Sequence, residues 1–442
     1  MRELAATRAI GSEWSGTFQV RAVHLLAAVP LADVIVAQVQ ARLDVSLGPL
    51  SLAQVFHGLL LVVFLAVIVG RVFHIAAPAR PVAIAAVFFG ASIVLSAVVR
   101  GSGGRLCLED FVSDLKVLYW LAAWMACMVL CRRPEDFRVI LGGLAIAGTY
   151  AATSVLAVYF LGMEELSPYE GIAASAGGLN TAKGLGGILV VTGLVWIWLT
   201  RRSHQLLGAA GFVLCYVALV LTYQRAGLVA GGLAALWLAS WRILRPRGPP
   251  DRNWAFRPIL LSLVPALMIT LVLGTTDLEK RWNDLGDVDK AGSGRAALWQ
   301  EAAAVHAEAD LLGKVVGIGY ADLLDNIESR RGPRIHSHTD VLDALVIYGV
   351  LGLLCWLAVN WAILQMILRK GLTLPASAAA LAVFLVMVLE CVLTGQMFGP
   401  HVMSFYLLAI FGICLGSQSR QRCAAPSVRL ANPETPAKGC HD

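Results

Sequence analysis

The chain has 442 residues, of which 58% are hydrophobic and 14% charged, and its formal net charge is +6. An average soluble domain carries about 25% charged residues, so this composition indicates an integral membrane protein. The basic residues lie between apolar runs, and no basic, aromatic-interleaved surface indicates nucleic acid as a partner. The nine cysteines are scattered singly, without a CxxC pair, and so predict neither a disulfide framework nor a zinc site.

Apolar runs recur along almost the whole chain and define its expected architecture. A spanning helix needs about 20 residues, because each residue rises 1.5 Å through a core about 30 Å thick. We expect about 12 transmembrane helices, at residues 22–40, 52–70, 81–99, 112–131, 138–161, 184–200, 206–223, 226–241, 258–274, 341–367, 375–394 and 402–416. The predicted fold class is an all-α polytopic membrane protein, whose first apolar run is a retained anchor because a polar segment precedes it.

Basic residues are distributed unevenly among the short loops, and this sets the expected orientation. They gather before the first span, around residues 242–257 and in the tail, so the positive-inside rule places both termini in the cytoplasm. In a bacterium the opposite side is the periplasm. The predicted organisation is spans 1–9 in residues 1–274, a large periplasmic loop in 275–339, spans 10–12 in 340–417, and a disordered cytoplasmic tail in 418–442.

The polar segment between the ninth and tenth spans holds most of the residues able to do chemistry. Residues 294–312, GRAALWQEAAAVHAEADLL, predict a short amphipathic helix, because apolar residues recur at spacings of four, three and four. KVVGIGYADLL then predicts an apolar turn with two glycines. Its GIG, at residues 317–319, is a weak nucleotide signal because no buried strand precedes it.

Two histidines lie where the tenth span begins. His338 would stand at the outer mouth of a membrane helix, and a near-neutral group on a rigid element there suits a general base. The alternative is an interfacial histidine that only ends a loop. His336 and His338 form an HxH pattern, but no third histidine, cysteine or compact carboxylate set is evident beyond Asp340. We therefore predict no metal site.

Arginines supply the candidate anion-binding groups. Arg225 is the charged residue of the tight outer turn between the seventh and eighth spans, where a guanidinium can donate two parallel hydrogen bonds to a phosphate. It could instead be a snorkelling arginine, and Arg295 could be an ordinary solvated helix residue. The loop is locally basic, which would also suit anionic lipid head groups, and its further arginines are Arg281, Arg330, Arg331 and Arg334.

Carboxylates also occur inside the predicted spans, at Asp33 and Glu390. An ionisable residue within the membrane is costly and is by default a functional candidate. Either carboxylate could instead be a hydrogen-bonding partner between helices.

In combination, these segments resemble the O-antigen ligase and polymerase family of bacterial envelope glycosyltransferases. The resemblance rests on QRAGL at 224–228, GSGRAALW at 292–299, GIGY at 317–320 and HSHTDVLDALVIYGVLG at 336–352, with an Asn-containing loop at 162–183. The family pattern is a histidine, an Asn directly after it, a leucine four positions on and a glycine eleven positions on. His338, Leu342 and Gly349 match, whereas Thr339 replaces the usual Asn, for which Asp340 or His336 could substitute.

The resemblance implies an inverting, metal-independent and cofactor-free glycosyltransferase in the bacterial inner membrane. The donor would be a glycan on undecaprenyl diphosphate, and the acceptor a sugar hydroxyl of a growing O-antigen or exopolysaccharide chain or of the lipid A core. Arg225 and Arg295 would bind the diphosphate, and His338 would take the acceptor proton. Possible supporting residues are Arg281, Arg334, His336 and Asp340.

Two other classes of function stay open at this stage. A multispan transporter or flippase of lipid-linked saccharides would explain the spans and Glu390, but it leaves the polar loop without a role. A non-catalytic scaffold for envelope assembly would need the fold and not the individual polar residues. Substitution of His338 and Arg225 distinguishes an enzyme from both.

Overall fold

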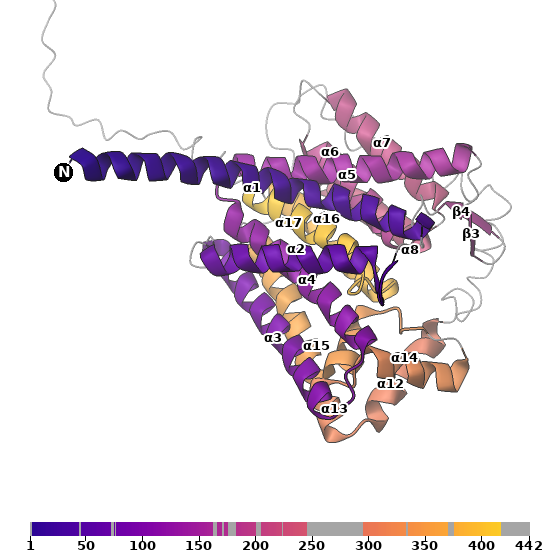
Figure 1. Cartoon of the computed structure of the whole chain (residues 1–442). Coiled ribbons are helices and arrows are strands. Elements are labelled where there is room, and N and C mark those ends of the chain that lie inside the picture. The colour runs from indigo at the N-terminus through magenta and orange to yellow at the C-terminus, as the bar shows by residue number, and fades with distance from the viewer. Residues whose placement is uncertain are drawn as a thin grey trace, which may run out of the picture.

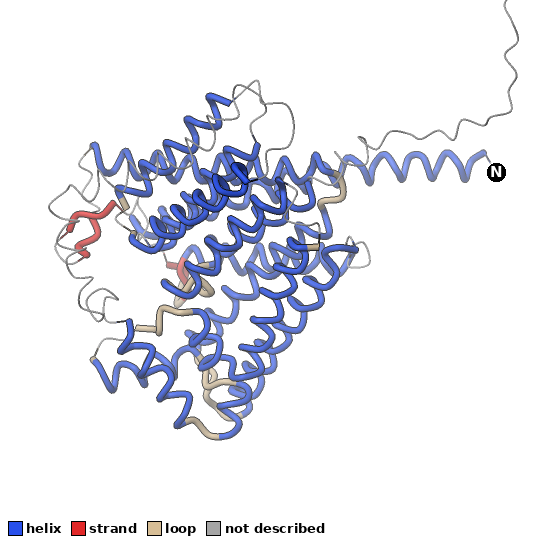
Figure 2. Tube along the Cα trace, turned by 180° about the vertical axis from the view of Figure 1, so that it is seen from behind, coloured by secondary structure: helices blue, strands red, loops and turns tan. Residues whose placement is uncertain are grey.

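The computed structural model describes residues 2–43, 46–71, 75, 77–161, 166–169, 172–175, 183–199, 205–222, 224–244, 295–332, 335–369 and 375–416. Within these ranges the regular structure is helical apart from two short hairpins (Figures 1 and 2). Strand β1 (Ser46–Leu47) pairs antiparallel with β2 (Leu50–Ser51), and β3 (Leu166–Tyr169) pairs antiparallel with β4 (Ile172–Ser175).

The N-terminal part of the described chain is a series of apolar helices. They are α1 (Arg2–Leu43), α2 (Leu52–Arg71), the 3-10 turn η2 (Ala77–Ala79), α3 (Arg80–Ser102), α4 (Leu108–Leu130), α5 (Pro134–Phe160), α6 (Lys183–Leu199), α7 (Gln205–Leu221) and α8 (Arg225–Leu244). Local chemistry determines where they begin. Pro134 opens α5 with a pre-set φ, and Asp136 accepts the peptide N–H groups of Arg132 and Arg133 at 2.9 and 2.8 Å.

The C-terminal part contains short helices followed by long ones. They are α12 (Arg295–Glu308), α13 (Leu311–Val316), α14 (Tyr320–Arg331), α15 (Asp340–Leu368), α16 (Pro375–Leu393) and α17 (Pro400–Gly416). In Figure 1 the short helices α12, α13 and α14 gather at one end of the molecule, where they pack on α3, α4 and α15.

The described helices define an all-α polytopic membrane protein. Seven of them, namely residues 21–43 of α1 with α2, α3, α4, α5, α15 and α16, are long and apolar enough to cross a membrane. Four shorter apolar helices lie within α6, α7, α8 and α17. These eleven segments coincide with eleven of the predicted spans, and the twelfth, residues 258–274, lies outside the described residues.

The polar loop is more finely divided than its sequence pattern suggests. The amphipathic helix predicted for residues 294–312 ends at Glu308, because Asp310 starts a new helix by accepting the Gly313 N–H at 2.6 Å. The predicted turn after it is restricted to residues 317–319. Helix α14 follows directly, and we did not predict it.

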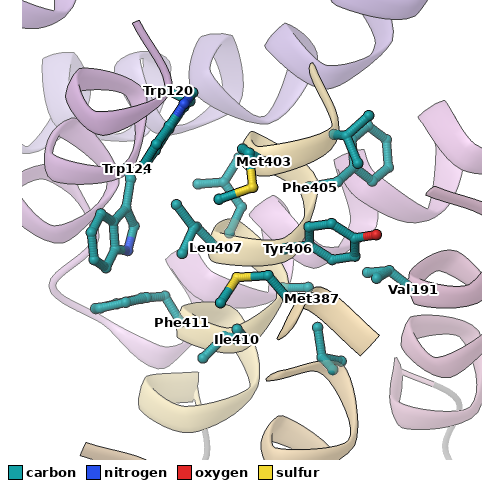
Figure 3. Packing of buried hydrophobic residues seen from close by; sticks show 14 of the residues in the cluster. Trp120, Trp124, Val191, Met387, Met403, Phe405, Tyr406, Leu407, Ile410 and Phe411 are labelled. Atoms are coloured by element: carbon teal, nitrogen blue, oxygen red, sulfur yellow. The ribbon is translucent and has the colours of Figure 1, made fainter. Parts of the chain in front are cut away.

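Helix α17 is packed on several sides. It contacts α4, α5, α6 and α16, and Figure 3 shows its side chains between Trp120 and Trp124 of α4 and Met387 of α16. The rings of Trp124 and Phe411 meet edge to face at 5.1 Å between centroids. Helix α17 is therefore held as a fixed element, and the loop that precedes it starts from a rigid base.

Helix α15 is broken at Gly349, whose φ of 70° and ψ of −173° lie outside the helical range. The loop of residues 317–319 fits against the break, where the Ile318 N–H donates to the Val346 carbonyl at 3.0 Å. The backbones approach so closely that a Cβ on Gly349 would lie 2.3 Å from the Val315 carbonyl oxygen. The first glycine of the GIG, Gly317, permits the same close approach, since a Cβ there would lie 2.0 Å from the Ile347 carbonyl oxygen.

Gly349→Ala is expected to lower the unfolding temperature of the purified protein in detergent. A side chain at positive φ costs about 1–3 kcal/mol, and the clash with Val315 adds to that cost. Gly58→Ala on α2 is the matched control, because an added Cβ there meets nothing within 4 Å. Equal unfolding temperatures for the two variants, measured by thermal denaturation, would contradict the role of the break.

Candidate functional site

The segment that connects α14 to α15 is organised by one buried carboxylate. Asp343 is fully buried in the first turn of α15. Its Oδ1 accepts the Ser337 hydroxyl at 2.6 Å and the Ser337 N–H at 3.2 Å, and its Oδ2 lies 2.9 Å from His336 Nδ1. A carboxylate that accepts several hydrogen bonds fixes the groups that donate them. Asp343 therefore fixes the backbone and side chains directly before His338.

His338 has an unusual backbone conformation. Its φ of 57° is in the left-handed region, and no other described non-glycine residue has a positive φ. The His338 and His336 rings meet at nearly right angles with their centroids 4.3 Å apart. A Cβ added to Gly395, between α16 and α17, would lie 3.2 Å from the His338 Cα. His338 is thus held between its own loop and the loop that follows α16.

That second loop, residues 394–399, is anchored through both backbone groups of one residue, Met397. The Met397 N–H donates to Asp340 Oδ1 at 2.8 Å. The Met397 carbonyl accepts the Trp120 indole N–H at 2.9 Å. Asp340 is at the start of α15 and Trp120 is on α4, so the loop is tied to two helices that are distant in sequence.

Glu390, one turn before the end of α16, is the buried carboxylate at the near side of this loop. Its Oε2 accepts the Thr394 hydroxyl at 2.9 Å, and the amides of Gln396 and Gln224 both lie 3.4 Å from it. Gln224 directly precedes Arg225. The turn that carries Arg225 is therefore joined to the same end of α16 as residues 394–399.

Arg295 completes the convergence. Its Nη1 donates to the carbonyl of Leu393, the last residue of α16. Arg295, His338 and the Gln224–Arg225 turn come from three separate segments, yet all of them contact residues 390–395. The structure thus brings these predicted site residues together at one end of α16.

Other predicted site residues can be placed only in part. Arg225 is the first residue of α8, and its side chain is not among the described ones. Arg281 and Arg334 lie outside the described residues, as does most of the Asn-containing loop 162–183. Among the described residues, no group of three or more His, Cys, Asp and Glu side chains could hold a metal ion.

Two arginines of the polar loop are engaged in ion pairs. Arg330 bonds to Glu308 at 2.5 Å and lies 3.5 Å from Glu301, and Arg331 lies 3.6 Å from Glu301. The hydrogen bond to Glu308 raises the pKa of the Arg330 guanidinium. These pairs join α14 to α12. The two arginines therefore contribute to the packing of these helices more directly than to a basic surface exposed to solvent.

Titratable groups nearby on the short helices respond to burial. Burial lowers the pKa of His306 on α12, and Lys314 adds to the shift. Burial also raises the pKa of Asp322 on α14, with a further contribution from Asp110. Both shifts agree with the partial burial of these two side chains.

One buried polar cluster was missed at the sequence level. Arg100 at the end of α3 lies 2.8 Å from both Asp110 and Asp114 of α4. Asp110 also accepts the N–H groups of Tyr320 and Ala321, at 2.6 and 3.0 Å, which open α14. The signal was an arginine followed closely by two aspartates at the mouth of a span, where intramembrane charges are expected to pair.

Asp33 proves to be a partner between helices. Its two oxygens accept the Tyr119 hydroxyl at 2.9 and 2.8 Å, and His57 Nε2 lies 3.3 Å from Oδ1. The contacts join α1, α2 and α4. This agrees with the structural alternative for Asp33, whereas Glu390 lies among the candidate site residues.

The class of this protein, an all-α polytopic membrane protein, follows from its helices. Residues 210–357, which include Arg225, Arg295 and His338, match the family model described as O-antigen ligase. The resemblance to the O-antigen ligase and polymerase family is therefore confirmed. No curated protein matches the chain in sequence.

Arg100→Met is expected to destabilise the protein by about 3–5 kcal/mol, because it leaves two buried carboxylates without their cation. The side chain of Arg100 is 2% exposed, whereas that of Arg330 is 27% exposed. Arg330→Met is therefore the matched control, and we expect it to cost about 0–1 kcal/mol. Unfolding of both variants in detergent measures the difference. Similar losses in the free energy of unfolding would show that the buried Arg100 ion pairs stabilise the protein no more than the exposed pairs of Arg330.

Proposed function

We propose that this chain is a membrane glycosyltransferase of the O-antigen ligase type. It moves a glycan from undecaprenyl diphosphate onto a sugar hydroxyl, without a metal or a cofactor. The observation that carries the proposal is the meeting of Arg295, His338 and the Gln224–Arg225 turn at one end of α16. These three segments lie within residues 210–357, which match the family model.

The arginines act on the donor. Arg225 and Arg295 bind the diphosphate, which gains negative charge as the bond between its oxygen and the anomeric carbon breaks. Guanidinium groups suit this task because they donate paired hydrogen bonds and stay charged. Preorganised positive charge at the leaving group stabilises the transition state more than the ground state. Arg281 and Arg334 are proposed as supporting cations.

His338 acts on the acceptor. As the acceptor oxygen attacks the anomeric carbon, its proton passes to the His338 imidazole and the electron pair of the broken bond leaves on the diphosphate. A single direct displacement of this kind inverts the anomeric configuration. Asp340 supports the site by fixing Met397 in the loop of residues 394–399, and His336 supports it through the ring contact.

The proposed orientation follows from the distribution of Lys and Arg. Both termini are cytoplasmic, residues 275–339 face the periplasm, and the chain resides in the bacterial inner membrane. The acceptor is either the end of a growing glycan, in a polymerase, or the lipid A core, in a ligase. Deleting the gene distinguishes the two, since a polymerase leaves single repeats on the carrier and a ligase leaves long chains there.

His338→Ala and Arg225→Ala are expected to abolish glycan transfer in cells while protein level and membrane insertion stay normal. Loss of a general base costs about 10²–10⁴-fold in rate, and loss of a charge-stabilising donor about 10²–10³-fold. Surface glycan profiles of a deletion strain that carries each variant provide the measurement, with His306→Ala as the control. Wild-type polymer from both variants would refute the enzyme and favour a transporter or a scaffold.

Chelation is expected to leave the purified enzyme active. The proposed charge stabilisation comes from arginines, so transfer measured with excess EDTA should equal transfer without it. Loss of activity on chelation that one divalent metal restores would show that the arginines do not act alone.

A further inference from the structure

Three aromatic rings from separate segments meet beside the candidate site. Tyr320 is the first residue of α14, Phe398 lies between α16 and α17, and His336 precedes α15. The Tyr320 and Phe398 rings are 4.9 Å apart, and His336 lies 6.4 Å from Tyr320 and 6.5 Å from Phe398. All three are half-buried, so each ring keeps part of its surface accessible.

A buried carboxylate holds each of these rings in place. Asp110 accepts the N–H of Tyr320, Asp340 accepts the N–H of Met397, which directly precedes Phe398, and Asp343 bonds to the His336 ring. The three carboxylates are 1%, 0% and 0% exposed. Burying three carboxyl groups is costly, and their common effect is to fix the segments that carry one aromatic surface.

The hydrogen bond to Asp343 sets the tautomer of His336. Both Ser337 donors bond to Oδ1 of Asp343, which leaves Oδ2 to accept the proton of His336 Nδ1. The His338 N–H is 3.3 Å from the same nitrogen, but the contact to Asp343 is shorter, at 2.9 Å. In the neutral ring, Nε2 then carries the lone pair.

Nε2 of His336 is available for a ligand. Among the described residues it makes no hydrogen bond, and the side chain is 22% exposed. An accessible acceptor atom next to half-buried aromatic rings suits a sugar, which presents C–H groups on its faces and hydroxyls at its rim. The His338 ring lies 4.3 Å away, so one sugar ring can address both histidines.

We propose that His336, Tyr320 and Phe398 form the acceptor subsite of this chain. The acceptor sugar packs on the Tyr320 and Phe398 rings, and one of its hydroxyls donates a hydrogen bond to Nε2 of His336. A neighbouring hydroxyl is thereby directed to His338. Asp343 is a positioning residue that acts through His336. This inference rests on the proposed glycosyl transfer and adds how the acceptor is held.

The test separates binding of the acceptor from turnover. The full chain is purified in detergent and supplied with lipid-linked donor and acceptor glycan, both extracted from a strain in which the gene is deleted. Transfer rates are measured while each substrate is titrated in turn. The variants are His336→Phe, which keeps a ring without its nitrogens, His336→Gln, Asp343→Asn and Phe398→Leu. The matched controls are His306→Phe on α12 and Asp325→Asn on α14, which stand outside the ring cluster.

His336→Phe, Asp343→Asn and Phe398→Leu are each expected to raise the acceptor KM about tenfold, as expected for the loss of one hydrogen bond or ring contact. The donor KM should change less than about twofold, because the variants remove contacts to the acceptor and not to the donor. His336→Gln should recover part of the acceptor affinity, because its amide oxygen can accept a hydroxyl. The controls should match the wild type.

An unchanged acceptor KM in His336→Phe and Phe398→Leu would overturn the subsite, as would an equal rise in the donor KM. If His336→Phe does not fold, His336→Gln and Phe398→Leu decide by the same criterion. Failure of the proposed function is seen separately, as absence of transfer by the wild type or full activity of His338→Ala. The subsite alone would be refuted if the wild type transfers glycan, His338→Ala does not, and His336→Phe and Phe398→Leu keep the wild-type acceptor KM.

Discussion

Peptide groups inside an apolar helix bundle need protein partners, because no water satisfies them there. The loop of residues 394–399 shows how this chain meets that requirement. Asp340 accepts a hydrogen bond from the Met397 N–H, and the Trp120 indole donates one to the Met397 carbonyl. Glu390 accepts the hydroxyl of Thr394. Since these partners come from α15, α4 and α16, the loop fixes the relative positions of the helices that carry the candidate site.

The same requirement explains the break in α15. A helix interrupted at Gly349 loses intrahelical hydrogen bonds, and the freed Val346 carbonyl accepts the Ile318 N–H from the loop before α14. This contact and the bonds from Asp110 to the start of α14 tie the polar loop to the membrane helices, as does the bond from Arg295 to Leu393. The short helices are thereby placed next to the start of α15, where the two histidines lie.

Much of the fold could be predicted from the sequence, because hydropathy and helix length are local properties. Eleven predicted spans coincide with apolar helices to within a few residues. Motif spacing also predicted Arg295 and His338 as site residues, and both lie beside residues 393–395. The partners of these residues could not be predicted, since Leu393 and Gly395 are far from them in sequence and no periodicity reports such contacts. Helix α14 was missed because the GIG before it was interpreted as an isolated turn.

The two histidines on either side of Ser337 have different physical surroundings. His336 is oriented by a buried carboxylate that defines its tautomer, whereas His338 has a left-handed backbone and packs against Gly395. An imidazole locked by Asp343 is suited to hold a hydroxyl in a constant place. A neighbouring imidazole on a strained backbone, fixed by its surroundings, is suited to receive a proton from the next hydroxyl. Under the two proposals, His336 binds the acceptor and His338 receives its proton, so the two histidines of the HxH pattern have separate roles.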